Sequence, residues 1–319
     1  KMDKFLEWLD QPLLEQGGLK SGMFLAFMII LASVLALMII VYKVGIKRKH
    51  MREEIGKRPI EESTTVRPAD IPVLEAANMQ GQGERHEQQD AFGLSLLDAY
   101  EQQGILAVLC DGMGGMFEGG RIAQIVSARL LGAYPWLDDD TVLPFVEEIS
   151  ADIYRKFLGH GGSTLVAITI RKNRLRFWSV GDSDLFLLRE AHLYALNQRQ
   201  EYKNELLMHA LEGMGSVEAA YQDPQAGALL EYIGKEDVQC DYLRIPFFLL
   251  PGDTLLLCSD GVSDTLTRKQ IQEAMYLQPQ ACCEKLEEEI LQADRENQDN
   301  YTAIVLRYHG SHREEGGSK

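Results

Sequence analysis

The chain has 319 residues, of which 45% are hydrophobic and 25% are charged, the proportions of a protein with a packed core. Its formal net charge is −16, and most of the negative charge lies beyond residue 74. This body would be repelled by a phosphate backbone, which excludes nucleic acid as a partner. Five cysteines without a CxxC pair exclude a disulfide framework and a cysteine-based zinc site, so a reduced compartment is expected.

An apolar segment without charged residues occupies residues 23–42. Its length matches the roughly 20 residues with which a helix crosses the hydrocarbon layer, whereas a signal peptide has a shorter apolar core. Five basic residues follow within residues 43–52, against three in residues 1–22, so the positive-inside bias places the body in the cytoplasm. We therefore expect a single-pass anchor in the cell membrane, with the lipid bilayer as a partner. Residues 1–22 would be a short extracytoplasmic or interfacial segment.

The segment after the anchor, residues 43–72, is basic, then mixed in charge, and contains three prolines without apolar periodicity. This composition predicts a solvated tether. A folded domain is expected over residues 73–310, followed by a disordered tail at 311–319.

Short β-type runs and helical segments alternate through the folded domain. The tip Lys172-Asn173 between two apolar runs indicates a hairpin and therefore antiparallel pairing. Strands come in groups with helices between the groups, which favours the α+β class over a parallel doubly wound sheet. The predicted strands are Ile105–Cys110, Thr164–Ile170, Arg174–Val180, Leu185–Arg189, Thr254–Ser259 and Thr302–Tyr308, and the predicted helices are 119–134, 141–158, 200–213 and 279–293.

Acidic residues stand at the ends of the apolar runs. Asp111, Asp182 and Asp260 follow such runs, Asp299 precedes one, and Asp90 lies ahead of another. A single Asp-Gly is usually only a turn. Five carboxylates at strand ends are different, because a sheet fixes such positions and converging carboxylates repel unless cations lie between them. Ligands that are all oxygens indicate Mg²⁺ or Mn²⁺.

The motifs RHEQQD, DGMGG, GST, GDS, SDG and DN followed by Thr occur in this order within residues 78–308. This ordered set resembles the metal-dependent protein phosphatases of type 2C in their bacterial form. The resemblance implies a four-layer α-β-β-α sandwich, in which two mainly antiparallel sheets are flanked by helices and the metals lie at one end. Residues 190–250 would form a flap that shapes the substrate groove.

The resemblance also implies a centre with two Mn²⁺ or Mg²⁺ ions and a third, weaker ion. Asp111 would bind both main ions, and the Gly112 carbonyl would bind one of them. The other implied ligands are Asp260 and Asp299 on one ion, Asp90 directly or through water, and Asp182 at the third ion.

The implied function is a membrane-anchored serine/threonine protein phosphatase that hydrolyses its substrate with a metal-activated water. Arg85, five residues before Asp90, would grip the phosphate, and Arg85 and Asp111 would be the catalytic residues. Phosphorylated proteins would be the partners, with a membrane serine/threonine kinase as one candidate and a regulator of transcription as another. The alternative from a different class is a pseudophosphatase that acts as a membrane-tethered binding module.

Three positions depart from the family pattern. Met116 stands where a His, a candidate proton donor, is frequent, and Gly120 stands where Glu is common. Asp184 stands where the family has Arg. None of these changes removes a core metal carboxylate, but they leave the general acid open, and a metal-bound water is one candidate.

Overall fold

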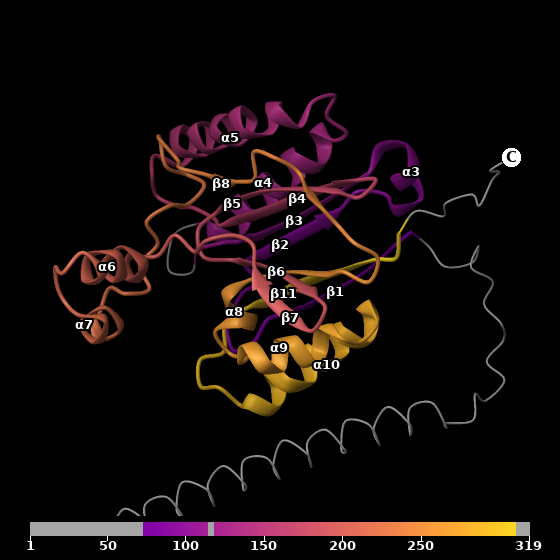
Figure 1. Cartoon of the computed structure of the whole chain (residues 1–319). Coiled ribbons are helices and arrows are strands. Elements are labelled where there is room, and N and C mark those ends of the chain that lie inside the picture. Colours follow the sequence, from indigo (N-terminus) through magenta and orange to yellow (C-terminus); the bar gives the residue numbers. More distant parts are fainter. Residues whose placement is uncertain (1–72, 114–117, 311–319) are drawn as a thin grey trace, which may run out of the picture. The chain divides into compact units, whose positions relative to one another are not determined.

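The computed structural model describes residues 73–113 and 118–310 (Figure 1). The expected segment 1–22, anchor 23–42, tether 43–72 and tail 311–319 lie outside the described residues, as does Met116. Within the part that the structure describes, no helix has both the length and the apolar character needed to span a membrane.

Two antiparallel sheets form the centre of the domain. The five-stranded sheet has the order β1-β11-β10-β6-β7, and the six-stranded sheet has the order β2-β3-β4-β5-β8, with β9 also paired to β5. The strands are β1 (Leu74–Gly81), β2 (Asp90–Leu94), β3 (Ile105–Asp111), β4 (Leu165–Arg171), β5 (Arg174–Val180), β6 (Asp184–Arg189), β7 (His192–Ala195), β8 (Asp241–Tyr242), β9 (Phe247–Phe248), β10 (Thr254–Cys258) and β11 (Tyr301–Tyr308).

Helices cover the outer face of each sheet (Figure 1). Helices α4 (Gly119–Ala133) and α5 (Val142–Phe157) pack on the six-stranded sheet, while α9 (Arg268–Met275) and α10 (Pro279–Ala293) pack on the five-stranded sheet. The layers therefore follow the order α-β-β-α, which confirms the expected α+β sandwich. The remaining helices are η2 (Leu97–Ala99), α3 (Tyr100–Gln103), η3 (Asp139–Thr141), α6 (Tyr202–Leu211), α7 (Val217–Gln222) and α8 (Asp260–Ser263).

Alternation along the strands builds this sandwich. In β3, Leu106 and Val108 pack with α4 and α5, whereas Ala107 and Leu109 belong to the core between the sheets. Successive side chains of a strand point to opposite faces, so a strand covered on both faces is apolar throughout. This explains why the central strands are visible in the sequence as continuous apolar runs.

The observed strand ends lie within one residue of the predicted strands, and the helix ends lie within two residues of the predicted helices. The predicted flap of residues 190–250 is too wide, however. β7 pairs with β6, and β8 and β9 pair with β5, so these segments belong to the sheets. An edge strand has unpaired backbone groups, which these short strands satisfy. Only the part between β7 and β8, which carries α6 and α7, projects from the sandwich (Figure 1).

Candidate metal centre

Strand ends from both sheets meet at one edge of the sandwich. Asp90 begins β2 and Asp111 ends β3, and the two residues are direct partners in the antiparallel ladder. In the other sheet, β10 ends at Cys258 and Asp260 begins α8 shortly after it, while Asp299 lies two residues before β11. Antiparallel pairing puts the end of one strand beside the start of its neighbour, so the sheets fix these carboxylates at the same edge.

Asp90 connects the two sheets. The hydroxyls of Ser259 and Thr302 donate hydrogen bonds to its Oδ2 at 2.9 and 2.7 Å. Its other oxygen, Oδ1, is buried and has no hydrogen-bond partner among the described residues. Burial raises the pKa of Asp90 to about 6, the two hydroxyls oppose this rise, and repulsion from Asp260 adds to it. One oxygen is therefore fixed by two hydroxyls, and a smaller contribution from the Asp111 side chain also opposes the rise.

Asp111 lies at the centre of the mutual repulsion. Burial raises its pKa well above the usual range, and the charges of four other carboxylates raise it further. Asp260 behaves similarly, because burial, then Asp264 and Asp299, raise its pKa to about 6. Asp260 Oδ1 is also buried without a hydrogen-bond partner in the described part of the chain. The four carboxylates that act on Asp111 are Asp90, Asp260, Asp182 and Asp299.

Arg85 contacts this group from outside. Its Nη2 donates a 2.6 Å hydrogen bond to Asp299 Oδ2, and 47% of the Arg85 side chain is exposed. The predicted phosphate-binding residue and a predicted metal ligand are therefore neighbours. An exposed ion pair of this kind contributes only about 0–1 kcal/mol, so Arg85 can leave Asp299 at little cost.

Two glycines allow the backbone to come this close to the carboxylates. A Cβ on Gly261 would lie 2.0 Å from the carbonyl oxygen of Asn300, and a Cβ on Gly112 would lie 2.4 Å from the carbonyl carbon of Gly119. Neither contact is possible for a larger residue without movement of the backbone. Gly112 of the DGMGG motif and Gly261 of the SDG motif are thus explained by packing.

The GST motif lies directly behind Asp111. Thr164 Oγ1 accepts a 2.9 Å hydrogen bond from the backbone N–H of Asp111 and lies 2.7 Å from the Ser183 hydroxyl. Asp182 precedes Ser183 in the turn before β6. Burial raises the pKa of Asp182 to about 7, Asp260 acts in the same direction, and Arg199 acts against it.

The donor set fits divalent cations such as Mg²⁺ or Mn²⁺. All side-chain donors are carboxylate oxygens, and two of these oxygens are buried and unpaired, which is the environment that such cations compensate. Within residues 73–113 and 118–310, no three His, Cys, Asp or Glu side chains close around a single point. Among the described residues, Asp90 Oδ2 accepts hydrogen bonds from two hydroxyls, and Asp299 Oδ2 accepts one from Arg85.

A second acidic group, which the sequence did not predict, lies next to this centre. Arg199 contacts Asp184, Glu201 and Asp264 at 2.6–3.1 Å. The sequence contained one signal, because Asp184 departs from the family pattern. Asp264 also lies four residues after Asp260, which is one helical turn. The pairing of Asp184 with Arg199 had no sequence signal.

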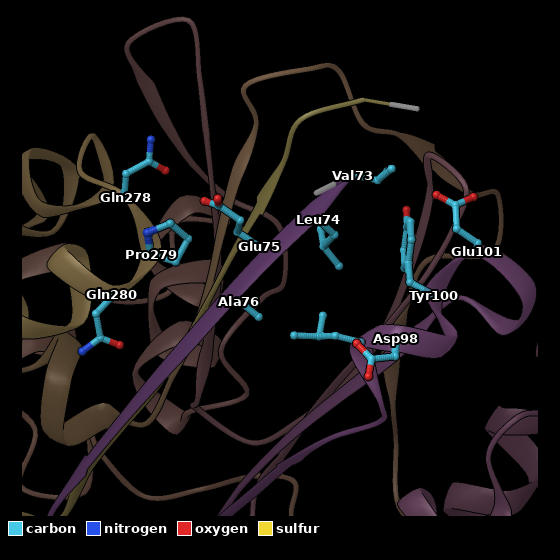
Figure 2. Close-up of a pocket in the computed structure, with 11 residues that line it drawn as sticks. Val73, Leu74, Glu75, Ala76, Asp98, Tyr100, Glu101, Gln278, Pro279 and Gln280 are labelled. Atoms are coloured by element: carbon cyan, nitrogen blue, oxygen red, sulfur yellow. The ribbon is translucent and has the colours of Figure 1, made fainter. Parts of the chain in front are cut away.

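A pocket of about 620 Å³ lies elsewhere, between β1, α3 and the start of α10 (Figure 2). It is lined by Leu74, Tyr100 and Pro279, among others. β1 runs from Leu74, which pairs with Tyr308, to Gly81, which pairs with Tyr301. The pocket lies at the Leu74 end, whereas the carboxylates lie beside the Gly81 end. None of the predicted site residues lines this pocket, so the convergent carboxylates and not this hollow mark the candidate site.

A family model and several known proteins match this chain. The family model described as protein phosphatase 2C matches residues 82–296. The serine/threonine phosphatase stp of Listeria welshimeri is 29% identical over 240 residues, which cover 70% of this chain and 90% of that protein.

Solved structures resemble the domain as well. The serine/threonine phosphatase PstP/Ppp of Mycobacterium tuberculosis has a TM-score of 0.63 and 26% identity, and the match covers 74% of this chain and 99% of that chain. The catalytic domain of a serine threonine protein phosphatase PstP, solved in complex with two manganese ions, has a TM-score of 0.60 and 26% identity over 74% of this chain and 98% of that chain.

Proposed function

This chain belongs to the protein phosphatase 2C family and is a protein phosphatase, and we propose that it removes phosphate from serine and threonine side chains. The relatives named as serine/threonine phosphatases support this substrate class. The observation that carries the proposal is the group of repelling carboxylates at the joint edge of the two sheets, with unpaired oxygens on Asp90 and Asp260.

We propose that Asp90, Asp111, Asp260 and Asp299, with the Gly112 carbonyl, hold two Mn²⁺ or Mg²⁺ ions. When bound, such a pair of cations supplies an acidified water and neutralises charge on the phosphoryl oxygens. The buried Oδ1 atoms of Asp90 and Asp260 support this assignment, because they have no hydrogen-bond partner among the described residues and a bound cation would compensate them. The hydroxyls of Ser259 and Thr302 keep Asp90 oriented while its Oδ1 stays free.

Arg85 would bind the phosphate of the substrate. Its guanidinium is exposed beside Asp299, so it can turn outward and donate two parallel N–H bonds to phosphate oxygens. The planar fork fixes the orientation of the phosphorus and compensates negative charge. Arg85 therefore binds and orients the substrate, while the carboxylates determine where the cations lie.

The test is the release of phosphate by the full chain in mild detergent. Phosphoserine, phosphothreonine and phosphotyrosine peptides are compared with Mn²⁺, with Mg²⁺ and with a chelator. We expect turnover of the first two peptides only, and only with a metal. Asp260→Asn should abolish this turnover, whereas Asp98→Asn, an exposed carboxylate at the pocket of Figure 2, should retain it.

Turnover in chelator, or an Asp260→Asn variant as active as the wild type, would refute the metal assignment. A folded, Mn²⁺-loaded chain without turnover would instead favour the binding-module alternative.

We also propose that residues 23–42 anchor the enzyme in the cell membrane with its domain in the cytoplasm. The support is the uncharged apolar sequence and the basic residues that follow it. This location would direct the enzyme to substrates at the membrane, such as a serine/threonine kinase. The full chain should remain in the membrane pellet after an alkaline carbonate wash, and deletion of residues 23–42 should release it. Release of the full chain by the same wash would refute the anchor.

A further inference from the structure

The guanidinium of Arg199 is the centre of a compact polar cluster. Arg199 lies in the connection between β7 and α6, and only 18% of its side chain is exposed. Its Nε and Nη2 donate to the carboxylate of Asp184, with a shortest distance of 2.6 Å. Its Nη1 donates to Glu201 at 3.1 Å and to Asp264 at 2.8 Å, and its Nη2 also reaches the Ser263 hydroxyl at 2.6 Å.

The carboxylates of this cluster depend on that one guanidinium to different degrees. The Asp184 side chain is 8% exposed, and Arg199 is its only cationic partner among the described ion pairs. The Glu201 side chain is 4% exposed and also contacts Lys203 at 2.6 Å. The Asp264 side chain is 44% exposed and is therefore partly compensated by water. Loss of Arg199 would thus leave Asp184 as the uncompensated buried charge.

The cluster adjoins the place where a third metal ion is expected. Asp184 lies two residues after Asp182, and in the sheet it pairs with Cys258, two residues before Asp260. Asp264 follows Asp260 by one helical turn, at the end of α8. The charge of Arg199 acts on both Asp182 and Asp260 and favours their ionised forms. Positive charge is therefore already present beside Asp182.

We propose that the Arg199 guanidinium takes the place of the third metal ion in this chain, so that the enzyme binds two divalent ions and not three. The inference rests on the proposed two-metal centre and concerns only the site at Asp182. A divalent ion there would meet the positive charge of Arg199, which Asp184 and Asp264 hold in place. Displacing the guanidinium would leave Asp184 buried without a partner, which is costly. The residues around Asp182 therefore do not fit a third ion.

The same contacts explain the departure at residue 184. A positively charged residue at this position would face Arg199 and be repelled, whereas Asp184 accepts from Nε and Nη2 along one edge of the guanidinium. The acidic residue at 184 and the basic residue at 199 are thus a matched pair, one at the start of β6 and the other in the connection between β7 and α6.

The experiment counts Mn²⁺ ions bound per chain by calorimetric titration of the metal-free full chain in detergent. The key variant is Asp184→Asn/Arg199→Gln, which removes both charges of the buried pair together and leaves Glu201 with Lys203. The matched control is Asp253→Asn/Arg189→Gln, because Arg189 binds Asp253 through Nε and Nη2 in the same way, at the opposite end of β6.

We expect two Mn²⁺ ions in the wild type and in the control, and three in Asp184→Asn/Arg199→Gln. Adding Asp182→Asn to that variant should return the number to two. Asp182→Asn in the wild-type background should leave the number at two. This comparison tests the site at Asp182 while Arg199 stays unchanged.

If the wild type bound three ions and Asp182→Asn bound two, the inference about the third ion would be wrong, while the two-metal function would stand. Two ions in a folded Asp184→Asn/Arg199→Gln variant would also overturn it. A wild-type chain that binds no Mn²⁺ would instead overturn the two-metal function, and this inference with it.

Discussion

Two groups of carboxylates lie side by side at one edge of the sandwich, and their charges are balanced in different ways. Around Asp111 the acidic side chains repel one another, and oxygens of Asp90 and Asp260 remain buried without a partner. Around Arg199 the acidic side chains share one guanidinium at hydrogen-bond distance. Asp260 and Asp264, one helical turn apart, belong to different groups.

The difference separates two uses of buried charge. A carboxylate paired inside the protein contributes to the folded structure, and removing its partner is destabilising. A carboxylate without an internal partner makes the folded state less stable until a cation binds. The group around Asp111 therefore has the properties of a ligand site, whereas the group around Arg199 has those of a structural network.

The largest expected effect is the loss of catalysis when the repelling group loses a member. Asp111→Asn should lower kcat for a phosphothreonine peptide by on the order of 10³-fold, because a cation site is worth several kcal/mol of transition-state stabilisation. Steady-state kinetics with saturating Mn²⁺ measures this. Asp264→Asn, in the neighbouring group, is the matched comparison and should lose far less. Equal losses in the two variants would remove the distinction between the groups.

The next effect concerns the stability of the paired group. Arg199→Leu should lower the free energy of unfolding by about 3–5 kcal/mol, because Asp184 is left buried without a partner. Urea denaturation in the presence of chelator measures this loss. Asp184→Asn/Arg199→Gln should lose less than half as much, since both charges are removed together. An Arg199→Leu variant as stable as Arg155→Leu, a change at a 70% exposed arginine, would contradict the structural role of Arg199.

The next prediction concerns Arg85, which contacts Asp299 from outside the buried carboxylates. Arg85→Ala should lower kcat/KM about 100-fold, which corresponds to the loss of about 3 kcal/mol of charge-assisted hydrogen bonding to phosphate. Arg85→Lys should recover only part of this, because an ammonium lacks the planar fork. Mn²⁺ affinity should change little in either variant. If the variants lost Mn²⁺ but kept kcat/KM at saturating metal, Arg85 would support Asp299 and would not bind the substrate.

The smallest expected effect is a pH dependence of stability in the metal-free chain. The pKa values of Asp90 and Asp260 are raised to about 6 by burial, against about 4 for an unfolded chain. Between these values the folded state holds more protons than the unfolded state, so stability falls as pH rises through this window.

The metal-free wild type should therefore have a higher melting temperature at pH about 5 than at pH about 7.5, where about 1 kcal/mol corresponds to about 2–4 °C. Asp111→Asn should show a shallower dependence, because one repelling charge is gone. A melting temperature of the metal-free wild type that rises with pH over this range would contradict the raised pKa values of Asp90 and Asp260.

The sequence predicted the sheets and the convergence of the carboxylates because both depend on local patterns. Strands buried on both faces are visible as apolar runs, and Asp90, Asp111 and Asp260 stand where those runs begin or end. A sheet places the ends of neighbouring strands side by side, so the convergence of these residues could be predicted. Thr302 and Ser259 belonged to the motifs, but their hydrogen bonds to the same oxygen of Asp90 became visible only in the structure.

The Arg199 group could not be predicted because no local pattern marks it. Arg199 lies 15 residues after Asp184 in a connection without periodicity, and 65 residues before Asp264. Its partners come from the start of β6, from the residue before α6 and from the end of α8, and only the fold brings them together. The width of the flap was missed for a similar reason, since β8 and β9 contain two residues each and are too short to show alternation.

The most direct test of this account compares the melting temperatures of Asp111→Asn, Asp184→Asn and the wild type, first in chelator and then in saturating Mn²⁺. In chelator, Asp111→Asn should melt above the wild type, because repulsion is relieved, and Asp184→Asn should melt below it, because Arg199 loses its closest partner. Mn²⁺ should raise the melting temperatures of the wild type and Asp184→Asn and leave that of Asp111→Asn almost unchanged. If Asp111→Asn in chelator melts as far below the wild type as Asp184→Asn does, the carboxylates around Asp111 do not form a cation site held in repulsion, and the central claim is wrong.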